Sequence, residues 1–256
     1  VRHVSRVEAV AGERKTAVVT GGSGGIGSAI CQALAEAGYC VVVGYNASAN
    51  AASRLVSDLP GGGHQALAIP VTNSIAMTAA ARKVAEDYGC VDLLVNAAGM
   101  TRFVPHDDLE ALDDDLIQEI LDVNVRGVIV SVRTFMPLLR AAGAAVIVNI
   151  SSIAAVTGMG SNIAYCASKA AVDNLTISLA RAFSPTIRVV SVSPGLVATE
   201  FVKGLDEKWR ELQAGRTPLG RLAEPREVAA AVLSAAEHFT FTTGAILPVD
   251  GGRKIF

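Results

Sequence analysis

Seven short apolar runs, separated by longer segments of helical composition, limit the folds open to this chain more than any other feature. The runs are almost continuously hydrophobic, whereas a strand with one face in water alternates apolar and polar residues. This pattern is typical of strands that helices cover on both faces of a parallel sheet. We therefore predict an α/β fold with a doubly wound parallel sheet of about seven strands. The predicted strands span Thr16–Thr20, Cys40–Gly44, Gln65–Val71, Val91–Asn96, Ala144–Ile150, Ile187–Ser193 and Gly244–Val249.

The segments between these runs have the apolar spacing of amphipathic or alanine-rich helices. The turn Pro60–Gly63 and the glycines Gly38 and Gly143 mark places where a helix ends. Because no linker or internal repeat interrupts the pattern, we expect one domain over residues 1–256, with an N-terminal extension at residues 1–14. The predicted helices span Gly25–Ala37, Ala47–Asp58, Ser74–Tyr88, Leu116–Ala141, Ala164–Phe183 and Pro225–Glu237.

The least regular part of the chain lies between the sixth predicted strand and the last predicted helix, over residues 196–217. In a doubly wound sheet, ligands bind beyond the carboxyl ends of the strands. A long segment at that place is a candidate to close over a ligand. We predict that residues 196–217, which include the single tryptophan, Trp209, form a substrate lid.

Composition argues against several classes of function. The net charge of −2, without blocks of like charge, indicates no nucleic-acid surface. No apolar stretch reaches the roughly 18 residues of a membrane span, and residues 1–15 lack the apolar centre of a secretory signal. The four cysteines and four histidines have no metal-binding or C-x-x-C spacing. We therefore expect no metal site, cysteines that act as small core residues, and a cytoplasmic location.

A glycine-rich stretch follows the first predicted strand and opens the first predicted helix. It contains Gly22-x-Gly24-x-x-Gly27, the spacing of a dinucleotide-binding loop. Glycines let the backbone turn tightly and approach a pyrophosphate, and the N–H groups at a helix start can bind that anion. A flexible turn is the alternative interpretation, but the strand–loop–helix setting favours a dinucleotide site, as in Rossmann-type folds.

Motifs along the chain resemble, in order and spacing, those of the short-chain dehydrogenases/reductases. They are Thr20-Gly21-x-x-x-Gly25-Ile26-Gly27, Asn96-Ala97-Ala98-Gly99, Val123-Asn124-Val125, Ser151-Ser152, Tyr165-x-x-x-Lys169, Pro194-Gly195-x-x-x-Thr199, and Thr243-Gly244 through Asp250-Gly251-Gly252. The resemblance covers residues 15–253 and implies a Rossmann-type oxidoreductase that moves a hydride between NAD(P)(H) and a carbonyl or secondary alcohol. The implied cofactor contacts are Gly21, Ser23, Gly24, Gly25, Ile26, Gly27, Tyr45, Asn46, Val71, Asn96, Ala97, Ala98, Gly99, Tyr165, Lys169, Pro194, Gly195, Val197 and Thr199.

The resemblance implies a catalytic group of Asn124, Ser152, Tyr165 and Lys169. Tyr165 and Lys169 are four residues apart and share a helix face. Because an ammonium stabilises a phenolate, Lys169 is expected to lower the pKa of Tyr165 from its usual value of about 10, so that Tyr165 can act as general acid and base. By the same resemblance Ser152 binds the substrate oxygen, Lys169 also binds the nicotinamide ribose, and Asn124 holds a water or a helix carbonyl that positions Lys169.

Each of these residues has a plainer interpretation when taken alone. A tyrosine–lysine pair at helical spacing is usually on the surface, adjacent serines usually cap a turn or helix, and an asparagine near a glycine usually marks a kink. Their joint occurrence behind a dinucleotide loop favours an active site. A nucleotide-sensing protein without activity is a distant alternative, because both Tyr165 and Lys169 are present.

The end of the second predicted strand bears on the choice of cofactor. NAD selectivity usually depends on an acidic residue there, and the stretch Val43–Ser48 has none. Its absence favours NADP(H) over NAD(H), although no arginine or lysine lies close to Tyr45 in the sequence. Members of the family usually have an aspartate at the position of Pro70, so the adenine is expected to rely on the backbone around Val71.

Two substrate classes stay open. The layout resembles the 3-oxoacyl-carrier-protein reductase branch most closely, but Arg140 is the one basic residue in the two stretches where such enzymes dock an acidic carrier protein. A small free ketone or secondary alcohol is the other class. The residues expected to line the cleft are Met100, Arg102, Phe103, Ile153, Met159 and residues 196–209.

Two long predicted helices, Leu116–Ala141 and Ala164–Phe183, carry apolar residues on more than one face. A helix that is apolar all round must be buried, and one sheet covers only one side of it. Members of the family pack these helices against a second copy. We therefore expect a homotetramer, or failing that a dimer, with Val128, Val132, Val172 and Leu175 among the apolar residues concerned.

Overall fold

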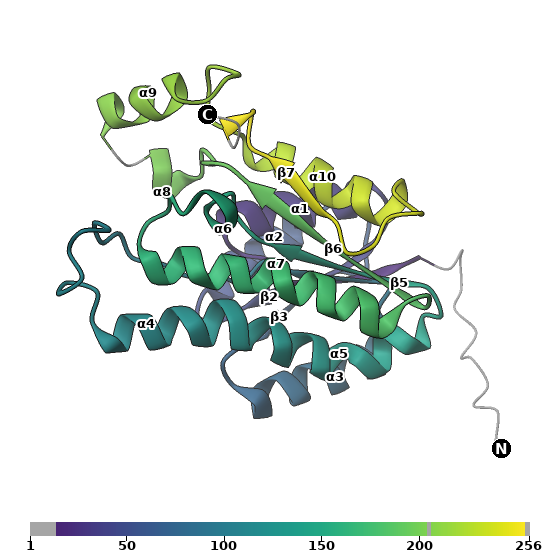
Figure 1. Ribbon diagram of the computed structural model, residues 1–256. Helices are drawn as coiled ribbons and strands as arrows, with labels where there is room; N and C mark the ends of the chain where they lie inside the picture. Colours follow the sequence, from purple (N-terminus) through teal and green to yellow (C-terminus); the bar gives the residue numbers. More distant parts are fainter. Residues whose placement is uncertain (1–13, 204–205, 254–256) are drawn as a thin grey trace.

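The computed structural model describes residues 14–203 and 206–253. Figure 1 shows a sheet with helices on both faces, as predicted. The sheet has seven strands in the order β3-β2-β1-β4-β5-β6-β7, and every neighbouring pair is parallel. The predicted doubly wound α/β fold is therefore confirmed. The strands are β1 Thr16–Thr20, β2 Cys40–Tyr45, β3 Gln65–Ala68, β4 Leu93–Asn96, β5 Ala145–Ile150, β6 Ile187–Pro194 and β7 Ile246–Val249.

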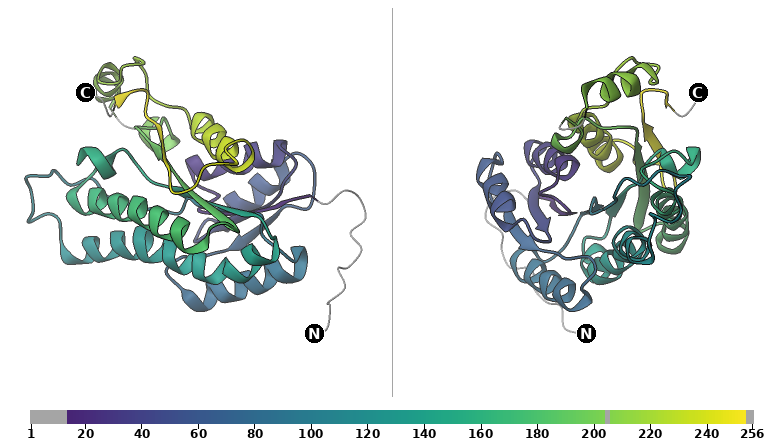
Figure 2. Two further views of the ribbon diagram at one scale, coloured as in Figure 1. Left: turned by 45° about the vertical axis from the view of Figure 1, so that its right-hand side comes forward. Right: turned by 90° about the vertical axis from the view of Figure 1, so that its left-hand side faces the viewer.

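The helices form two layers around this sheet. Helices α1, α2 and α10 cover one face, and α3, α5 and α7 cover the other (Figures 1 and 2). Each layer has its own apolar core, because successive residues of a strand point to opposite faces. The helices are α1 Gly25–Glu36, α2 Ala49–Asp58, α3 Ser74–Tyr88, α4 Asp114–Leu121, α5 Gly127–Ala141, α6 Ala154–Thr157, α7 Ile163–Phe183, α8 Glu200–Lys203, α9 Glu207–Gly215 and α10 Pro225–Glu237.

The predicted continuous helix over Leu116–Ala141 is wrong in detail. A π-helical turn over Asp122–Arg126, η1, separates α4 from α5, and Asn124 lies within it. Such a turn widens the helix by one residue and is frequent at functional sites. At Gly127, which follows it, a side-chain Cβ would lie 2.8 Å from Val71, so only glycine permits this close packing.

Two further predictions need correction. The strand expected over Gln65–Val71 ends at Ala68, close to Pro70, which has no N–H to donate to a neighbouring strand. The segment 196–217 contains two short helices, α8 and α9, where we predicted irregular structure. Of the N-terminal extension expected at residues 1–14, all but Arg14 lies outside the described residues.

The strand register brings the motif-bearing loops to one edge of the sheet. Thr20 pairs with Asn96 and Asn96 with Asn149, so β1, β4 and β5 end at nearly one level, whereas β6 and β7 continue beyond it to the pair of Pro194 and Val249. The loops that follow them therefore meet at the carboxyl edge, which is where ligands bind in folds of this kind.

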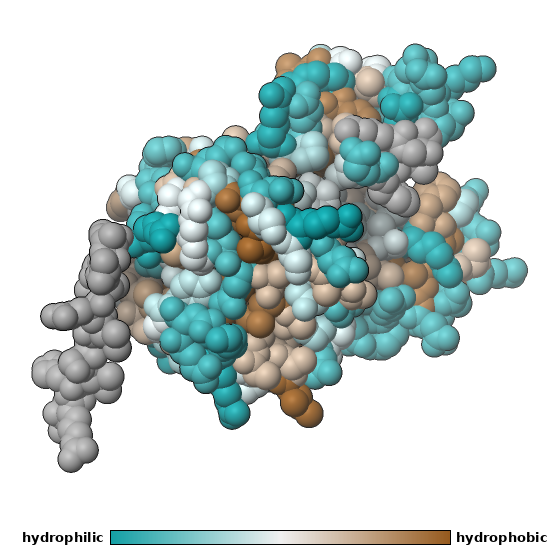
Figure 3. Space-filling model, turned by 180° about the vertical axis from the view of Figure 1, so that it is seen from behind, coloured by the Kyte–Doolittle hydropathy of each residue, from teal (hydrophilic) through white to brown (hydrophobic). Residues whose placement is uncertain are grey.

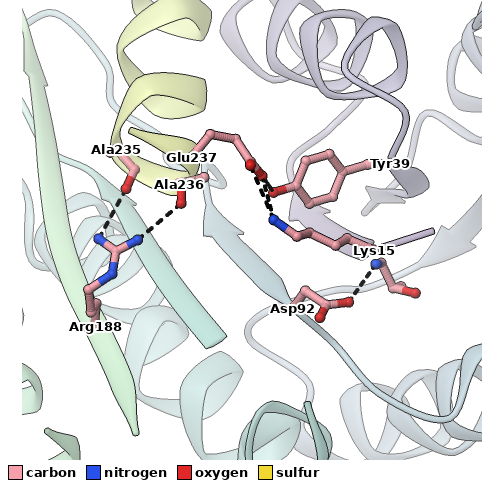
Figure 4. Close-up of polar contacts among 8 residues, drawn as sticks. Lys15, Tyr39, Asp92, Arg188, Ala235, Ala236 and Glu237 are labelled. Carbon is pink, nitrogen blue, oxygen red and sulfur yellow. Dashed lines mark hydrogen bonds and ion pairs between the residues drawn. The ribbon is translucent and has the colours of Figure 1, made fainter. Parts of the chain in front are cut away.

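The amino edge of the sheet holds a separate polar cluster (Figure 4). The Lys15 ammonium lies 3.0 Å from the Glu237 carboxylate, which also accepts a hydrogen bond from the Tyr39 hydroxyl. The Arg188 guanidinium donates to four carbonyl oxygens at and beyond the end of α10. These contacts join the first strand, the sixth strand and the last helix at the edge opposite the motifs. The four carbonyls belong to Ala235, Ala236, Phe239 and Thr242.

Among the described residues, no helix has the length and apolar character needed to cross a membrane. Within the same residues, no group of three or more histidine, cysteine or acidic side chains has the arrangement of a metal site.

Candidate active site

The glycine-rich loop between β1 and α1 fits a dinucleotide through its backbone. Gly21 has a φ of +65°, and a Cβ at this residue would lie 2.8 Å from Ala98. A Cβ on Gly27 would lie 2.1 Å from the carbonyl oxygen of Gly21, so any other residue would force the loop open. No side chain among the described residues caps α1 at Gly24, which leaves the first N–H groups of the helix for an anion. The loop geometry thus suits a pyrophosphate.

The segment after β4 packs against this loop. The N–H of Ala98 donates to Thr20 Oγ1 at 3.2 Å. The Asn96 side chain is 3% exposed and points into the sheet, where its Nδ2 donates to Asn149 Oδ1 at 2.9 Å. Asn96 therefore supports the sheet with its side chain, and the residues that face the loop are the ones that follow it, Ala97 to Gly99.

The other predicted cofactor contacts also lie at the carboxyl edge. Tyr45 is the last residue of β2, and Asn46 follows it. The Val71 side chain packs against Gly127 of α5, so Val71 can offer only its backbone to a ligand on the other side. A Cβ on Gly25 would lie 3.0 Å from the Thr199 side chain, which places the segment after β6 over the phosphate loop. The remaining predicted contacts on these two segments are Ser23, Gly24, Ile26, Pro194, Gly195 and Val197.

Tyr165, Lys169 and Ser152 meet where β5 and α7 come together. Lys169 Nζ lies 5.6 Å from the centre of the Tyr165 ring, one helical turn away, and donates to the Ile150 carbonyl at 2.9 Å. A hydrogen bond between Tyr165 and Ser152 joins the two hydroxyl-bearing side chains. The structure therefore brings together these three members of the predicted catalytic group.

The electrostatics of this group differ from the prediction. Burial raises the pKa of Tyr165 above its usual value of 10.0, and the hydrogen bond with Ser152 offsets this only in part. Burial also lowers the pKa of Lys169 to about 8, and the nearby Asp173 carboxylate acts in the opposite direction. The net shift of the Tyr165 pKa is therefore upward and not downward as expected, because burial removes the water that would stabilise the phenolate.

Comparison with known proteins identifies the family to which the chain is similar. The family model described as short chain dehydrogenase matches residues 15–210. The cis-4-hydroxycyclohexanecarboxylate dehydrogenase of Sinomonas cyclohexanicum is 38% identical over 93% of this chain and 96% of that protein. A 3-oxoacyl-acyl-carrier-protein reductase of Vibrio cholerae is 33% identical over 94% of this chain and 97% of that protein. A crystal structure from Burkholderia xenovorans, described as a short-chain dehydrogenase/reductase, is 32% identical with a TM-score of 0.88 and covers 96% of this chain and 100% of that one.

The chain belongs to the short-chain dehydrogenase/reductase family. It is an NAD(P)-dependent oxidoreductase that acts on alcohol and carbonyl groups. The resemblance stated from the motifs is thereby confirmed. The candidate active site of the enzyme lies at the carboxyl edge of the sheet.

The Asn124 side chain contacts α7 and the loop after β4 directly. Its Oδ1 accepts the Met100 N–H at 2.9 Å, and its Nδ2 donates to the Met100 carbonyl and to Ser168 Oγ, both at 3.0 Å. The carbonyl that holds Lys169 belongs to Ile150, on β5. The hydrogen bonds of the Asn124 side chain thus hold the loop after β4, while the Lys169 ammonium lies next to it across Gly99.

The predicted cleft residues are only partly available to a substrate. Phe103 and Met159 are exposed, but Ile153, which directly precedes the short helix α6, is buried. Arg102 forms an ion pair with Asp113 at 2.9 Å. In Figure 3 the segment that carries α9 projects from the body of the molecule. Near its base, a cavity of about 250 Å³ is lined by residues that include Gly195, Leu196, Thr217 and Arg221.

Two site residues escaped the sequence analysis. Ser168 Oγ donates to the Tyr165 carbonyl at 2.7 Å, and Asn162 accepts the Tyr165 N–H at 2.7 Å. The sequence could have indicated Asn162, because an asparagine directly before a helical run is a typical N-cap. Helix α7 accordingly begins at Ile163, one residue before the predicted start. Nothing in the sequence indicated Ser168, because a serine inside a helix usually bonds only to its own helix or to water.

Proposed function

We propose that Tyr165 is the proton donor and acceptor for reversible reduction of a small free ketone to a secondary alcohol, with NADP(H) as the preferred cofactor. The meeting of Tyr165, Ser152 and the Lys169 ammonium at the junction of β5 and α7 is the observation that carries this proposal.

The chemistry follows from what each side chain can donate. Bound at the glycine loop, the nicotinamide cofactor supplies or accepts the hydride. Ser152 donates a hydrogen bond to the substrate oxygen and orients it toward Tyr165. Tyr165 gives its phenolic proton to that oxygen during reduction and removes it during oxidation. Lys169, close to the ring of Tyr165, favours the phenolate that remains.

The direct test follows absorbance of the reduced nicotinamide with a panel of cyclic and acyclic ketones. We expect saturable, ketone-dependent oxidation of NADPH and the reverse reaction with the matching alcohols. Absence of turnover with every ketone and alcohol, in protein that binds the cofactor, would support the nucleotide-sensing alternative and overturn the proposal.

The preference for NADP(H) rests on charge at the end of β2. Asn46 is neutral and exposed, and no carboxylate follows Tyr45 that would repel a 2′-phosphate. We expect tighter binding of NADPH than of NADH, and we expect Asn46→Asp to reverse the order. Equal affinities in the wild-type protein, measured by titration of cofactor fluorescence, would contradict this part of the proposal.

Charge near the cleft favours a free ketone over a carrier-bound substrate. The stretch from Asp107 to Asp115 is an acidic run, which the sequence analysis did not single out, and it includes the start of α4. The loop before α4 contacts residues 160–162. An acidic carrier protein would meet repulsion there, whereas a small neutral ketone would not. Because the chain is similar to the 3-oxoacyl-acyl-carrier-protein reductase of Vibrio cholerae, the experiment also includes a carrier-bound substrate. The acidic residues are Asp107, Asp108, Glu110, Asp113, Asp114 and Asp115.

Rate constants and their dependence on salt distinguish a free ketone from a carrier-bound substrate. We expect kcat/KM for a free cyclic ketone to equal or exceed that for an acetoacetyl group on an acyl carrier protein, and the carrier-bound rate to rise with salt as repulsion is screened. A carrier-bound substrate preferred by more than about ten-fold, with a rate that falls with salt, would identify a carrier-protein reductase.

A homotetramer is the proposed assembly. Of the four apolar residues named for these helices, Val128, Val132 and Val172 are buried within one subunit, and Leu175 is half-buried. Other apolar residues remain exposed, and Leu121 and Ile129 line an open groove along α4, η1 and α5. Light scattering is expected to report four copies, and Ile129→Glu to lower that number. A monomer at micromolar concentration would contradict the assembly.

Residues 196–217 are proposed to act as the substrate lid. Trp209 is 37% exposed on α9, and Gln213 of the same helix accepts hydrogen bonds from Arg253 beyond β7. Saturable change of Trp209 fluorescence with NADPH and a substrate analogue is expected. A signal that responds to subunit dissociation but not to ligand would place Trp209 at a subunit contact instead.

A cytoplasmic location is also proposed. All four cysteines are free thiols, and three of them are buried, which suits a compartment that keeps thiols reduced. Cell fractionation checks this location directly.

A further inference from the structure

We propose that Asn162 is a positioning residue that joins the start of the catalytic helix to the loop over the substrate, so that Tyr165 and this loop keep a fixed relation. The inference rests on the proposed function of Tyr165 as the proton-transfer group. It assigns to Asn162 a role beyond that of a helix cap.

The side chain of Asn162 faces the interior and is 1% exposed. Its Oδ1 accepts the N–H of Tyr165 at 2.7 Å, which fixes the first turn of α7 at the residue that carries the reaction. Helices commonly begin with such a bond, and serine or aspartate can provide it equally well. This contact alone therefore does not require an asparagine.

The second half of the carboxamide distinguishes Asn162 from an ordinary cap. Its Nδ2 donates to the Arg102 carbonyl at 2.7 Å and to Thr101 Oγ1 at 3.2 Å, both in the loop that follows β4. Serine and aspartate have no N–H to offer these acceptors. Only an amide of this length caps α7 and holds the loop at once.

Neighbouring contacts extend the same connection. Ser161 Oγ lies 2.6 Å from Thr101 Oγ1, and the Ser161 carbonyl accepts the Val104 N–H at 2.8 Å. The loop is thus held against the start of α7 at several consecutive residues. It is the loop that contains Phe103, one of the residues expected to contact the substrate.

The main chain of Tyr165 is held from both sides. Asn162 binds its N–H, and Ser168, itself bound by Asn124, donates to its carbonyl at 2.7 Å. Asn124 and Asn162 also hold the loop after β4, at Met100 and at Thr101 and Arg102. Two asparagines from different elements therefore fix Tyr165 and the substrate loop together. Misplacement of a catalytic group by about 1 Å can lower the rate by about 100-fold.

Asn73 provides a matched control. It caps α3, where its Oδ1 accepts the N–H groups of Ile75 and Ala76 at 3.1 and 3.0 Å, but it makes no side-chain bond to a catalytic element. Loss of the exposed cap at Asn73 should lower the Tm by about 3 °C, and loss of the buried Asn162 side chain should lower it further because additional hydrogen bonds are lost. A role limited to capping predicts the same kinetics for Asn73→Ala and Asn162→Ala.

The experiment measures kcat, the KM of the ketone, the Kd of NADPH and the pH profile of kcat for Asn162→Ala, Asn162→Asp and Asn73→Ala. We expect Asn162→Ala to lower kcat/KM by about 10- to 100-fold, with NADPH affinity within about two-fold of wild type. We expect Asn162→Asp to keep the cap, but its buried carboxylate faces the Arg102 carbonyl, so the Tm should fall and kcat/KM should drop by about ten-fold. The pH profile of both variants should shift to higher pH as the Tyr165–Ser152 hydrogen bond weakens.

Kinetic constants and a pH profile equal to wild type in Asn162→Asp would overturn the inference, whatever the Tm of Asn162→Ala. Should Asn162→Ala fail to fold, Thr101→Val removes one acceptor and is expected to lower kcat/KM several-fold, and an unchanged value would again overturn the inference. Tyr165→Phe is measured in parallel. If it remains active, the proposed function fails; if it is inactive and the Asn162 variants are normal, only the role of Asn162 fails.

Discussion

The charged side chains at the two edges of the sheet differ in their partners and in their exposure to water. At the amino edge, Lys15 meets the Glu237 carboxylate, and Arg188 meets the carbonyls at the end of α10 (Figure 4). At the carboxyl edge, Lys169 is only 6% exposed, and its ammonium donates to the uncharged carbonyl of Ile150. Lys15 has a carboxylate partner and access to water, and the partly buried Arg188 has four carbonyl acceptors, whereas Lys169 has one carbonyl acceptor and almost no access to water.

This difference separates groups that stabilise the fold from a group that costs stability. A buried ammonium without a carboxylate in hydrogen-bond contact is unfavourable, and its lowered pKa is the sign of that cost. In parallel sheets the carboxyl edge is where ligands bind. The same topology that gathers the loops there therefore also gathers the unfavourable groups, and the opposite edge is free to serve stability alone.

The largest effect is expected from Tyr165→Phe. The ring and its packing remain, but the transferable proton is lost, so we expect kcat to fall by about 1,000-fold or more. NADPH affinity should stay within a few-fold of wild type, and thermal stability should change little, since Tyr165 donates no hydrogen bond that the fold needs. Steady-state rates with a ketone, together with a cofactor titration, check both parts. Near wild-type kcat would remove Tyr165 from the mechanism.

Lys169→Met should separate function from stability most clearly. We expect activity and NADPH binding to fall, while the free energy of unfolding of the cofactor-free protein rises by about 1–3 kcal/mol at neutral pH. The wild-type protein binds a proton at Lys169 in both states below about pH 8, so the full cost of burial is present there. Between pH 8 and the ordinary value of 10.5, only the unfolded state keeps this proton, so wild-type stability rises with pH and the advantage of the variant shrinks.

Denaturant unfolding at pH 7 and pH 10 tests this sign. A variant that is less stable than wild type at pH 7, in protein with unchanged secondary structure, would show that Lys169 stabilises the fold. Lys169 would then resemble the amino-edge charges, and the proposed contrast between the edges would be lost.

Sequence reasoning succeeded where local patterns decide the structure. Continuous apolar runs specified the parallel sheet, and the glycine spacing located the loop in which Gly27 cannot carry a side chain. The motifs also located Tyr165, Lys169 and Ser152, because one turn of helix and one strand end bring them together. Such features depend on residues close in sequence or on a topology with few alternatives.

Contacts between distant segments could not be predicted in this way. The partners of Asn124 and Asn162 lie in the loop after β4, and nothing in that loop marks Met100 or Arg102 as acceptors. The pKa values of Tyr165 and Lys169 depend on burial by several elements, so the motif alone gave the wrong direction for Tyr165. The π turn at Asn124 likewise depends on how α4 and α5 pack, and helical periodicity could not reveal it.

Arg188→Met tests the amino edge. The guanidinium satisfies carbonyls at the end of α10 at distances of 3.0–3.2 Å. Its loss leaves several of them with water alone, so we expect the free energy of unfolding to fall by about 2 kcal/mol. Since the site is at the opposite edge, kcat and KM should stay as in wild type. A loss of activity without a loss of stability would show that the two edges are coupled.

Lys15→Met is expected to have the smallest effect and gives the closest comparison with Lys169→Met, since both remove a lysine ammonium and keep an apolar stem. The Lys15 side chain is 54% exposed, and its ion pair with Glu237 is in contact with water. Such pairs contribute about 0–1 kcal/mol, so the variant should be slightly less stable than wild type, with normal kinetics. The difference should disappear at high salt, because mobile ions screen an exposed pair. Lys169→Met should keep its opposite effect under the same salt, since few ions reach a buried ammonium. If both lysine variants changed stability in the same direction and with the same salt dependence, burial would not be what distinguishes the carboxyl edge from the amino edge.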